Sequence, residues 1–175
     1  EPLNPVILSV YANVLRRSGQ TEEAKKYASQ AITCNPKCIL PLRRLALWHF
    51  NEEEFEEATS YYQKIRQLVP HRISASAGEA ACLLKTDKKE KAKEMFNVII
   101  EAAKDKSQHV PPGVLVWIYR NLEHKDQAYS WMHYIVENKY PEVIWFNPKD
   151  DNKDGFFSSA RFNEIMEPVG LDTLR

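Results

Sequence analysis

Apolar residues recur at intervals of three and four along most of the chain, the spacing that places them on one face of an α-helix. They fall into paired segments separated by short polar turns. The pattern predicts one helix from about Asn4 or Pro5 to Arg17 and a second from Thr21 to near Asn35. Further pairs are expected over about 39–72, 73–106 and 109–140.

The pairs repeat at a fixed spacing. Ala24, Ala58 and Ala92 stand 34 residues apart, and Ala128 follows after 36. Other small and large apolar positions keep the same phase: Leu8 and Leu42; Ala12, Ala46 and Ala80; Tyr62, Phe96 and Met132; Ile65, Ile99 and Ile135. A period of this length indicates an array of helical hairpins, each of which buries its apolar face against its neighbours.

This spacing resembles the tetratricopeptide repeat, a 34-residue helix–turn–helix unit. Small residues let the two helices approach closely, and prolines such as Pro36 and Pro70 stand where the second helix closes. The resemblance implies an all-α, right-handed α-solenoid of about four helix pairs. We expect an array over residues 1–140, with repeats at about 5–38, 39–72, 73–106 and 109–140, and a linker with a capping helix over 141–175.

Local signals refine these boundaries. Thr21 is expected to cap the second helix, and Asn51 with Glu54 has the spacing of a capping box before the fourth. The first helix of the third pair is rich in small residues from Ser74 to Ala81. Close helix packing would explain them, and a groove left open for a ligand is the alternative.

The end of the chain departs from the repeat. A short amphipathic helix over about 156–166 is expected to cover the apolar face of the last pair, as solenoids require. The residues that would form this cap are Phe157, Phe162, Ile165 and Met166.

This tail is similar to the C-terminal ends of bacterial tetratricopeptide proteins that carry an adenylate-cyclase, serine/threonine-kinase or winged-helix domain. The shared residues are Arg161, Phe162, Ile165, Met166, Gly170 and Leu171. Ser159-Ala160 stand where that family has Asp-Pro. The resemblance implies the regulatory part of a larger bacterial protein, and a chain that opens on Glu1 without Met agrees with a piece of one.

Composition limits the functional classes. Twenty-four basic and 24 acidic residues balance, which argues against a general nucleic-acid or anionic-membrane binder. No apolar run approaches the length of a membrane span, and no signal peptide opens the chain. Cys34, Cys38 and Cys82 are too few for a disulfide framework. The compartment stays open, with the cytoplasm favoured.

The first helices of tetratricopeptide pairs line a concave face, so repeat phase selects the residues expected to bind a partner. They are Asn13, Arg16, Arg17, Arg43, Arg44, Phe50, Lys85, Trp117 and Arg120. Arginines bind carboxylates through two parallel hydrogen bonds, so an acidic segment is a natural partner. A solvated face whose arginines pair with nearby glutamates is the alternative. The carboxylate clamp of chaperone-binding relatives is not expected, because of its five positions only Asn13 matches.

One loop has metal-ligand spacing. Asp150, Asn152 and Asp154, followed by Gly155, fit the opening of an EF-hand calcium loop. Position twelve should be a bidentate glutamate and is Arg161. A polar connecting loop is therefore the favoured interpretation, and we expect no metal and no cofactor.

An enzyme is not expected, because the five histidines share no catalytic or metal spacing and no nucleophile or phosphate-binding loop is present. The sequence predicts a scaffold that binds a protein or peptide segment. Self-association and a ligand- or calcium-responsive sensor remain as alternatives.

Overall fold

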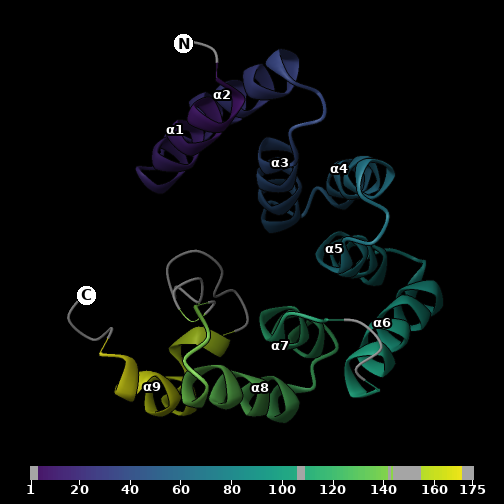
Figure 1. Ribbon diagram of the computed structural model, residues 1–175, viewed down its shortest axis with the longest axis vertical. Coiled ribbons are helices and arrows are strands. Elements are labelled where there is room, and N and C mark those ends of the chain that lie inside the picture. Colours follow the sequence, from purple (N-terminus) through teal and green to yellow (C-terminus); the bar gives the residue numbers. More distant parts are fainter. Residues whose placement is uncertain (1–3, 106–108, 142, 144–154, 171–175) are drawn as a thin grey trace. The chain divides into compact units, whose positions relative to one another are not determined.

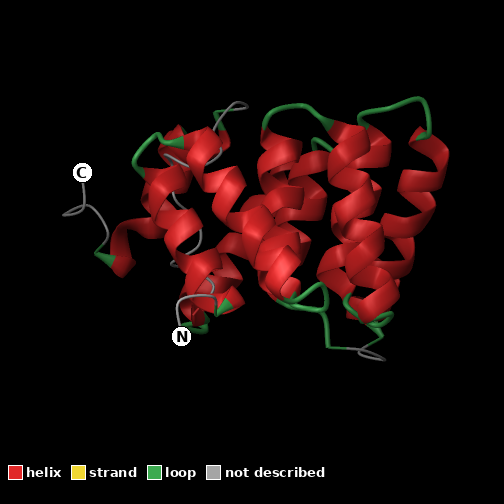
Figure 2. Ribbon diagram, turned by 90° about the horizontal axis from the view of Figure 1, so that it is seen from above, coloured by secondary structure: helices red, strands yellow, loops and turns green. Residues whose placement is uncertain are grey.

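The computed structural model describes residues 4–105, 109–141, 143 and 155–170. Helices and loops make up all of this described part, and it contains no strand (Figures 1 and 2). The predicted all-α class is confirmed. By its contacts the chain divides into two compact units, Glu1–Met95 and Phe96–Arg175, which are described separately below.

The first hairpin of unit one joins α1 (Pro5–Arg17) to α2 (Thr21–Cys34) (Figure 1). Asn4 caps α1, because its side-chain oxygen accepts from the backbone N–H groups of Val6 at 2.9 Å and Ile7 at 3.3 Å. Pro5 suits the first turn, where no backbone donor is needed. Gly19 makes the turn with a φ of +85°.

The second hairpin joins α3 (Ile39–Asn51) to α4 (Phe55–Leu68), and α5 (Ile73–Leu84) and α6 (Lys89–Lys104) follow. The predicted capping role of Asn51 is wrong, because Asn51 still belongs to α3 and Glu54 directly precedes α4. The prediction for Thr21 is also wrong. Thr21 is the first residue of α2, and its hydroxyl accepts from the Arg16 guanidinium at 2.7 Å.

The repeat alanines form the contacts between helices in unit one. Ala24 and Ala28 of α2 are fully buried with Leu45 and Trp48 of α3. In the same way, the α4 residues Ala58, Tyr62 and Ile65 share a core with Ala75 and Cys82 of α5. In unit one, α3 therefore packs on α2, and α5 packs on α4.

The small residues of α5 serve close packing. An added Cβ at Gly78 would lie only 2.2 Å from the ring of Tyr62 on α4. Ala75, Ala77, Ala80 and Ala81 are buried as well. This supports the packing interpretation of the stretch and leaves no open space beside Gly78.

Unit two contains α7 (Pro112–Asn121), α8 (Lys125–Glu137), the 3-10 turns η2 (Phe156–Ser158) and η3 (Glu167–Val169), and the short helix α9 (Ala160–Met166). Phe157, Phe162 and Met166 are buried with Met132 of α8, and Ile165 packs on the same cluster. Ser159 caps α9 by accepting from the Phe162 N–H at 3.1 Å.

Candidate functional site

Four arginines gather where α1, α3 and α5 meet in unit one. Arg17 ends α1, Arg43 and Arg44 are neighbours on α3, and Arg72 directly precedes α5. Contacts join α1 to α3 and α3 to α5. We call Arg17, Arg43, Arg44 and Arg72 the arginine cluster.

The positive charges of the arginine cluster repel one another. Burial, followed by the charge of Arg72, lowers the pKa of Arg43. Burial, followed by the charges of Arg43 and Arg17, lowers the pKa of Arg44. A guanidinium is such a strong base that both arginines stay charged at neutral pH in spite of the lowered pKa values. An anion placed among them would relieve this repulsion.

The two arginines on α3 differ in their partners. Arg44 Nε donates to the hydroxyl of the fully buried Ser9 on α1, at 3.2 Å. Arg43 is partly covered by its neighbours but keeps part of its surface open to solvent, and it forms no ion pair with any residue that the structure describes. Of these two arginines, Arg43 is therefore the one better placed to receive a carboxylate.

Three further predicted residues lie on the same unit. Asn13 is half-buried on α1, and its amide has no hydrogen-bond partner in the described part of the chain. Phe50 packs edge-on against Phe55, with ring centroids 5.6 Å apart. Lys85 is exposed at the end of α5.

Arg16 is engaged elsewhere. Its guanidinium donates to Thr21 and forms an ion pair with Glu52 at 3.2 Å, in the turn after α3. Lys25 of α2 pairs with the same Glu52 and lies 3.6 Å from Glu54. These contacts tie the first hairpin to the turn of the second, so Arg16 serves the contact between repeats.

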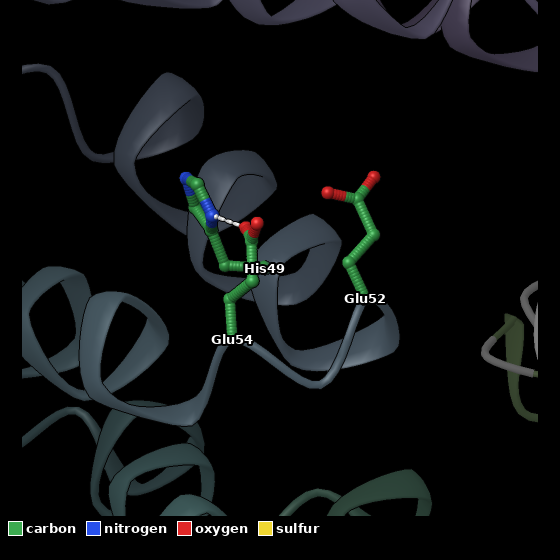
Figure 3. A group of neighbouring side chains, drawn as sticks. All are labelled: His49, Glu52 and Glu54. Atoms are coloured by element: carbon green, nitrogen blue, oxygen red, sulfur yellow. Dashed lines mark hydrogen bonds and ion pairs between the residues drawn. The ribbon is translucent and has the colours of Figure 1, made fainter.

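That turn also carries the one group of possible metal ligands in the described residues. Donor atoms of His49, Glu52 and Glu54 lie within 4.8 Å of one another, and His49 Nδ1 is 2.5 Å from a Glu54 oxygen (Figure 3). Arg16 and Lys25 already pair with Glu52, and Lys25 also pairs with Glu54. The closeness of His49, Glu52 and Glu54 is therefore explained by an ion-pair network.

A hollow of about 370 Å³ lies between α4 and α5, lined by Gln63, Arg66, Gln67, Pro70 and Glu79. Glu79 is 3% exposed and accepts hydrogen bonds from Gln63 and Arg66. These bonds satisfy the buried carboxylate, so the hollow presents no unpaired charge to a ligand.

In unit two the predicted residue Arg120 contacts the capping segment, residues 156–166. The Arg120 guanidinium lies 4.5 Å from the ring centre of Phe157 and 5.6 Å from that of Phe156, as in cation–π contacts. Trp117 is half-buried on α7. Arg120 thus contacts the segment that covers α8.

The calcium candidate Asp150, Asn152 and Asp154 lies outside the described residues. Arg161, at the twelfth position of that loop, pairs with Asp126 of α8 at 2.5 Å and lies over the Tyr129 ring. The guanidinium of Arg161 is therefore engaged by two residues of α8, Asp126 and Tyr129.

The cysteines are free thiols: Cys34 is exposed, Cys38 half-buried and Cys82 buried. Sequence reasoning missed Arg72, because repeat phase selects residues within the first helices and Arg72 lies one position before α5. The one sequence feature that could have pointed to Arg72 is its position just before the predicted third helix pair.

Comparison with known proteins identifies the repeat family to which these helical hairpins belong. Residues 7–38 and 49–110 match tetratricopeptide repeat families, and together they cover more than half of the chain. The chain belongs to the tetratricopeptide repeat proteins, and its fold is an all-α solenoid of such hairpins. Repeats of this family generally mediate protein–protein interactions.

Solved structures agree on the fold. The chain is similar to a tetratricopeptide repeat protein from Parabacteroides merdae, with 16% identity and a TM-score of 0.55, covering 97% of this chain and 60% of that one. It is also similar to MamA residues 41 to the end from Desulfovibrio magneticus, with 19% identity, a TM-score of 0.55 and 97% of both chains covered. No curated protein sequence matches significantly.

Finally, among the described helices, none combines the length and the apolar character needed to cross a lipid bilayer.

Proposed function

We propose that this protein is a scaffold whose first-helix surface binds an extended segment of a partner protein. The first-helix surface is formed by α1, α3 and α5 of unit one. The observation that carries the proposal is the arginine cluster, in which Arg43 has neighbouring positive charge and no acidic partner in the described residues.

The cluster indicates the chemistry of the segment. A carboxylate between Arg43 and Arg72 could accept charge-assisted hydrogen bonds, which are about twice as strong as neutral ones. Asn13 of α1 adds an amide donor and acceptor to the same first-helix surface. We therefore expect the partner segment to carry a glutamate, an aspartate or a chain terminus at this point.

The test compares matched peptides and matched variants. Extended peptides with glutamate are titrated against the same peptides with glutamine, with binding followed by fluorescence anisotropy. The glutamate series should bind more tightly, and added salt should weaken it. Arg43→Glu should weaken it about tenfold or more, equivalent to about 1.4 kcal/mol.

Lys26→Glu is the control, because it makes the same charge change on the exposed face of α2. Equal loss in both variants would mean that net charge alone drives binding. Unchanged binding in Arg43→Glu would remove the cluster from the proposal. Trp117 and Arg120 of unit two stay predictions, and Trp117→Ala and Arg120→Ala can be tested with the same peptides.

We also propose that the scaffold is the regulatory part of a larger bacterial protein. The support is the tail pattern from Arg161 to Leu171. An antibody against the scaffold should then detect, in cells of its source, a protein larger than 20.3 kDa. A single band of 20.3 kDa would contradict this.

A further inference from the structure

The first helices of unit one carry almost no negative charge. Neither α1 nor α3 contains an aspartate or a glutamate. The one acidic residue of α5 is Glu79, which is 3% exposed and pairs with Arg66 of α4. The chain as a whole has 24 acidic residues, so this lack is a local property of the first-helix surface. These helices therefore supply no free carboxylate to the arginine cluster.

The two arginines on α3 are not required by the packing of the repeat. The residues that correspond to Arg43-Arg44 in repeat phase are Ser9-Val10 in α1 and Ala77-Gly78 in α5. The helical hairpins therefore form with small or apolar residues at these positions. Burial, followed by neighbouring positive charge, lowers the pKa of both arginines, so their charge is unfavourable where it stands. Charged residues that packing does not need are candidates for binding.

Three members of the arginine cluster have no acidic partner. Arg43, Arg44 and Arg72 form no ion pair with any residue in the described part of the chain. One carboxylate brings a single negative charge and would leave most of this positive charge unbalanced. A phosphate monoester brings a charge of about −1.5 to −2 at pH 7, together with three acceptor oxygens. The charge of the cluster therefore matches a phosphate better than a carboxylate.

The placement of Arg43 and Arg44 favours the same choice. They are consecutive on α3, so their side chains leave the helix in directions that differ by roughly 100°. The two oxygens of a carboxylate lie in one plane, and a single guanidinium can occupy both. The three oxygens of a phosphate point in different directions and can accept from more than one guanidinium. Two arginines that diverge from one helix can therefore share a phosphate more readily than a carboxylate.

Arg44 is held in place for such a role. Its Nε donates to the hydroxyl of Ser9 at 3.2 Å, and Ser9 is fully buried on α1. The terminal nitrogens of this guanidinium have no hydrogen-bond partner among the described residues. Because the guanidinium is planar and rigid, a bond at Nε orients the remaining donors before a ligand arrives.

We propose that the arginine cluster binds a phosphorylated serine or threonine of the partner segment, with Arg44 joining Arg43 and Arg72 on the phosphate. This inference rests on the proposed function, because it takes the same surface as the place where the segment binds and adds the group that is recognised. Phosphorylation of the partner would then control its binding. A nucleic acid is less suited, because the basic and acidic residues of the chain balance.

The test uses the full chain and extended peptides that differ at one position, which is phosphoserine, glutamate or serine. Binding is followed by fluorescence anisotropy. The phosphoserine peptide should bind about tenfold more tightly than the glutamate peptide, and the glutamate peptide more tightly than the serine peptide.

The three affinities separate the two proposals. Equal binding of phosphoserine and glutamate, both tighter than serine, would overturn the phosphate inference and leave the proposed function standing. Tight binding of phosphoserine with no gain from glutamate would support the phosphate inference and remove the carboxylate from the proposed function. Equal binding of all three peptides would overturn both.

Arg44→Gln separates phosphate from carboxylate binding, because the proposed carboxylate lies between Arg43 and Arg72. It should remove most of the preference for phosphoserine and change glutamate binding by no more than about twofold, the effect of a screened charge. Lys26→Gln, the same loss of charge on the exposed face of α2, is the control and should keep the preference. Melting temperatures show that both variants are folded. An undiminished preference in Arg44→Gln would overturn the proposal.

The pH dependence gives a test without a variant. The second pKa of a phosphate monoester is about 6, and that of a glutamate side chain is about 4.3. Lowering the pH from about 7.5 to about 5 therefore removes most of one charge from phosphoserine and little from glutamate. The preference for phosphoserine should shrink over this range, and a constant preference would overturn the proposal.

A thymidine oligonucleotide tests the other source of phosphate. At physiological salt it should not displace the phosphoserine peptide. Displacement by the oligonucleotide, weakened in Arg44→Gln and unchanged in Lys26→Gln, would overturn the proposal, because the ligand of the cluster would then be a nucleic acid.

Discussion

The ring of Tyr62 on α4 occupies the position that a side chain at residue 78 of α5 would need. A Cβ added to Gly78 would lie 2.2 Å from Tyr62 Cε1, whereas carbon atoms in contact prefer about 3.5–4.0 Å. Tyr62 is only 5% exposed, and burial raises its pKa well above the ordinary value of 10.0. The ring is therefore enclosed and cannot easily move away.

Gly78→Ala is expected to destabilise unit one by about 1–3 kcal/mol, the usual cost of forcing extra volume into a packed core. The measurement is the free energy of unfolding in urea. Ser76→Ala, on the same helix and half-buried, is the control and should change little. A Gly78→Ala protein as stable as the original would show that α4 and α5 can separate at no cost.

Gly19 gives a second prediction, in which only backbone conformation changes. Its φ is +85°, and a Cβ there would meet no atom within 4 Å. Gly19→Ala should therefore cost about 1–2 kcal/mol, the penalty of the left-handed region for a residue with a side chain. Glu123 holds the same turn position in unit two with a φ of +62°.

Glu123→Gly is the reciprocal change. It should be neutral or stabilise by a few tenths of a kcal/mol, since relief of strain is offset by the greater freedom of glycine in the unfolded chain. Thermal unfolding of both variants checks the pair. Gly19→Ala should lose stability and Glu123→Gly should not, so a loss of stability in both would contradict the conformational argument.

The helices could be predicted from the sequence because the helical spacing of apolar residues and the repeat spacing recur along most of the chain. The predicted start at Asn4 or Pro5 and end at Arg17 agree with α1. The prolines at 36 and 70 follow helices that end at Cys34 and Leu68. Capping could not be predicted as well. The Asn51–Glu54 spacing looked like a capping box, but α3 continues through Asn51 and Glu53 turns with a φ of +66°.

The binding residues were harder to predict, because phase gives the face of a helix and not the direction of a long side chain. Arg16 reaches Glu52 in the next turn, and Arg120 reaches Phe157 in the capping segment. Arg43 has no such acidic neighbour in the described part of unit one. That difference depends on tertiary contacts between distant residues, which no local pattern encodes.

The capping segment gives a third prediction, in unit two. Tyr129 stacks on Phe156 with ring centroids 4.4 Å apart, and its hydroxyl lies 2.7 Å from Ser159 Oγ. Tyr129→Phe keeps the stack and removes the hydrogen bond, so it should cost about 1 kcal/mol. Phe156→Ala removes a side chain that is 1% exposed and should cost about 3–5 kcal/mol.

Chemical denaturation of the full chain measures both changes. Tyr134→Phe is the control, because Tyr134 lies on the same α8 helix and is 41% exposed. If Phe156→Ala were no more harmful than Tyr134→Phe, the segment after residue 155 would not stabilise α8.

The fourth prediction concerns acid. The hydrogen bond from His49 and then the charge of Lys25 lower the pKa of the Glu54 carboxyl below its ordinary value of 4.5. The unfolded chain therefore binds a proton at this site more readily than the folded chain does. By linkage, the contribution of Glu54 to stability is fully present above pH 4.5 and is lost as the pH falls through the lower folded value.

Glu54→Gln removes this contribution, so the variant should melt below the original protein at pH 7 and approach it as the pH falls below 4.5. Glu57→Gln is the matched control, since Glu57 is exposed on α4 and makes no ion pair among the described residues. Melting temperatures across the acid range measure the difference. A gap between Glu54→Gln and the original that stayed constant from pH 7 to acid would mean that the Glu54 charge does not support the turn. The link between the first two hairpins would then depend on Glu52 alone, with its partners Arg16 and Lys25.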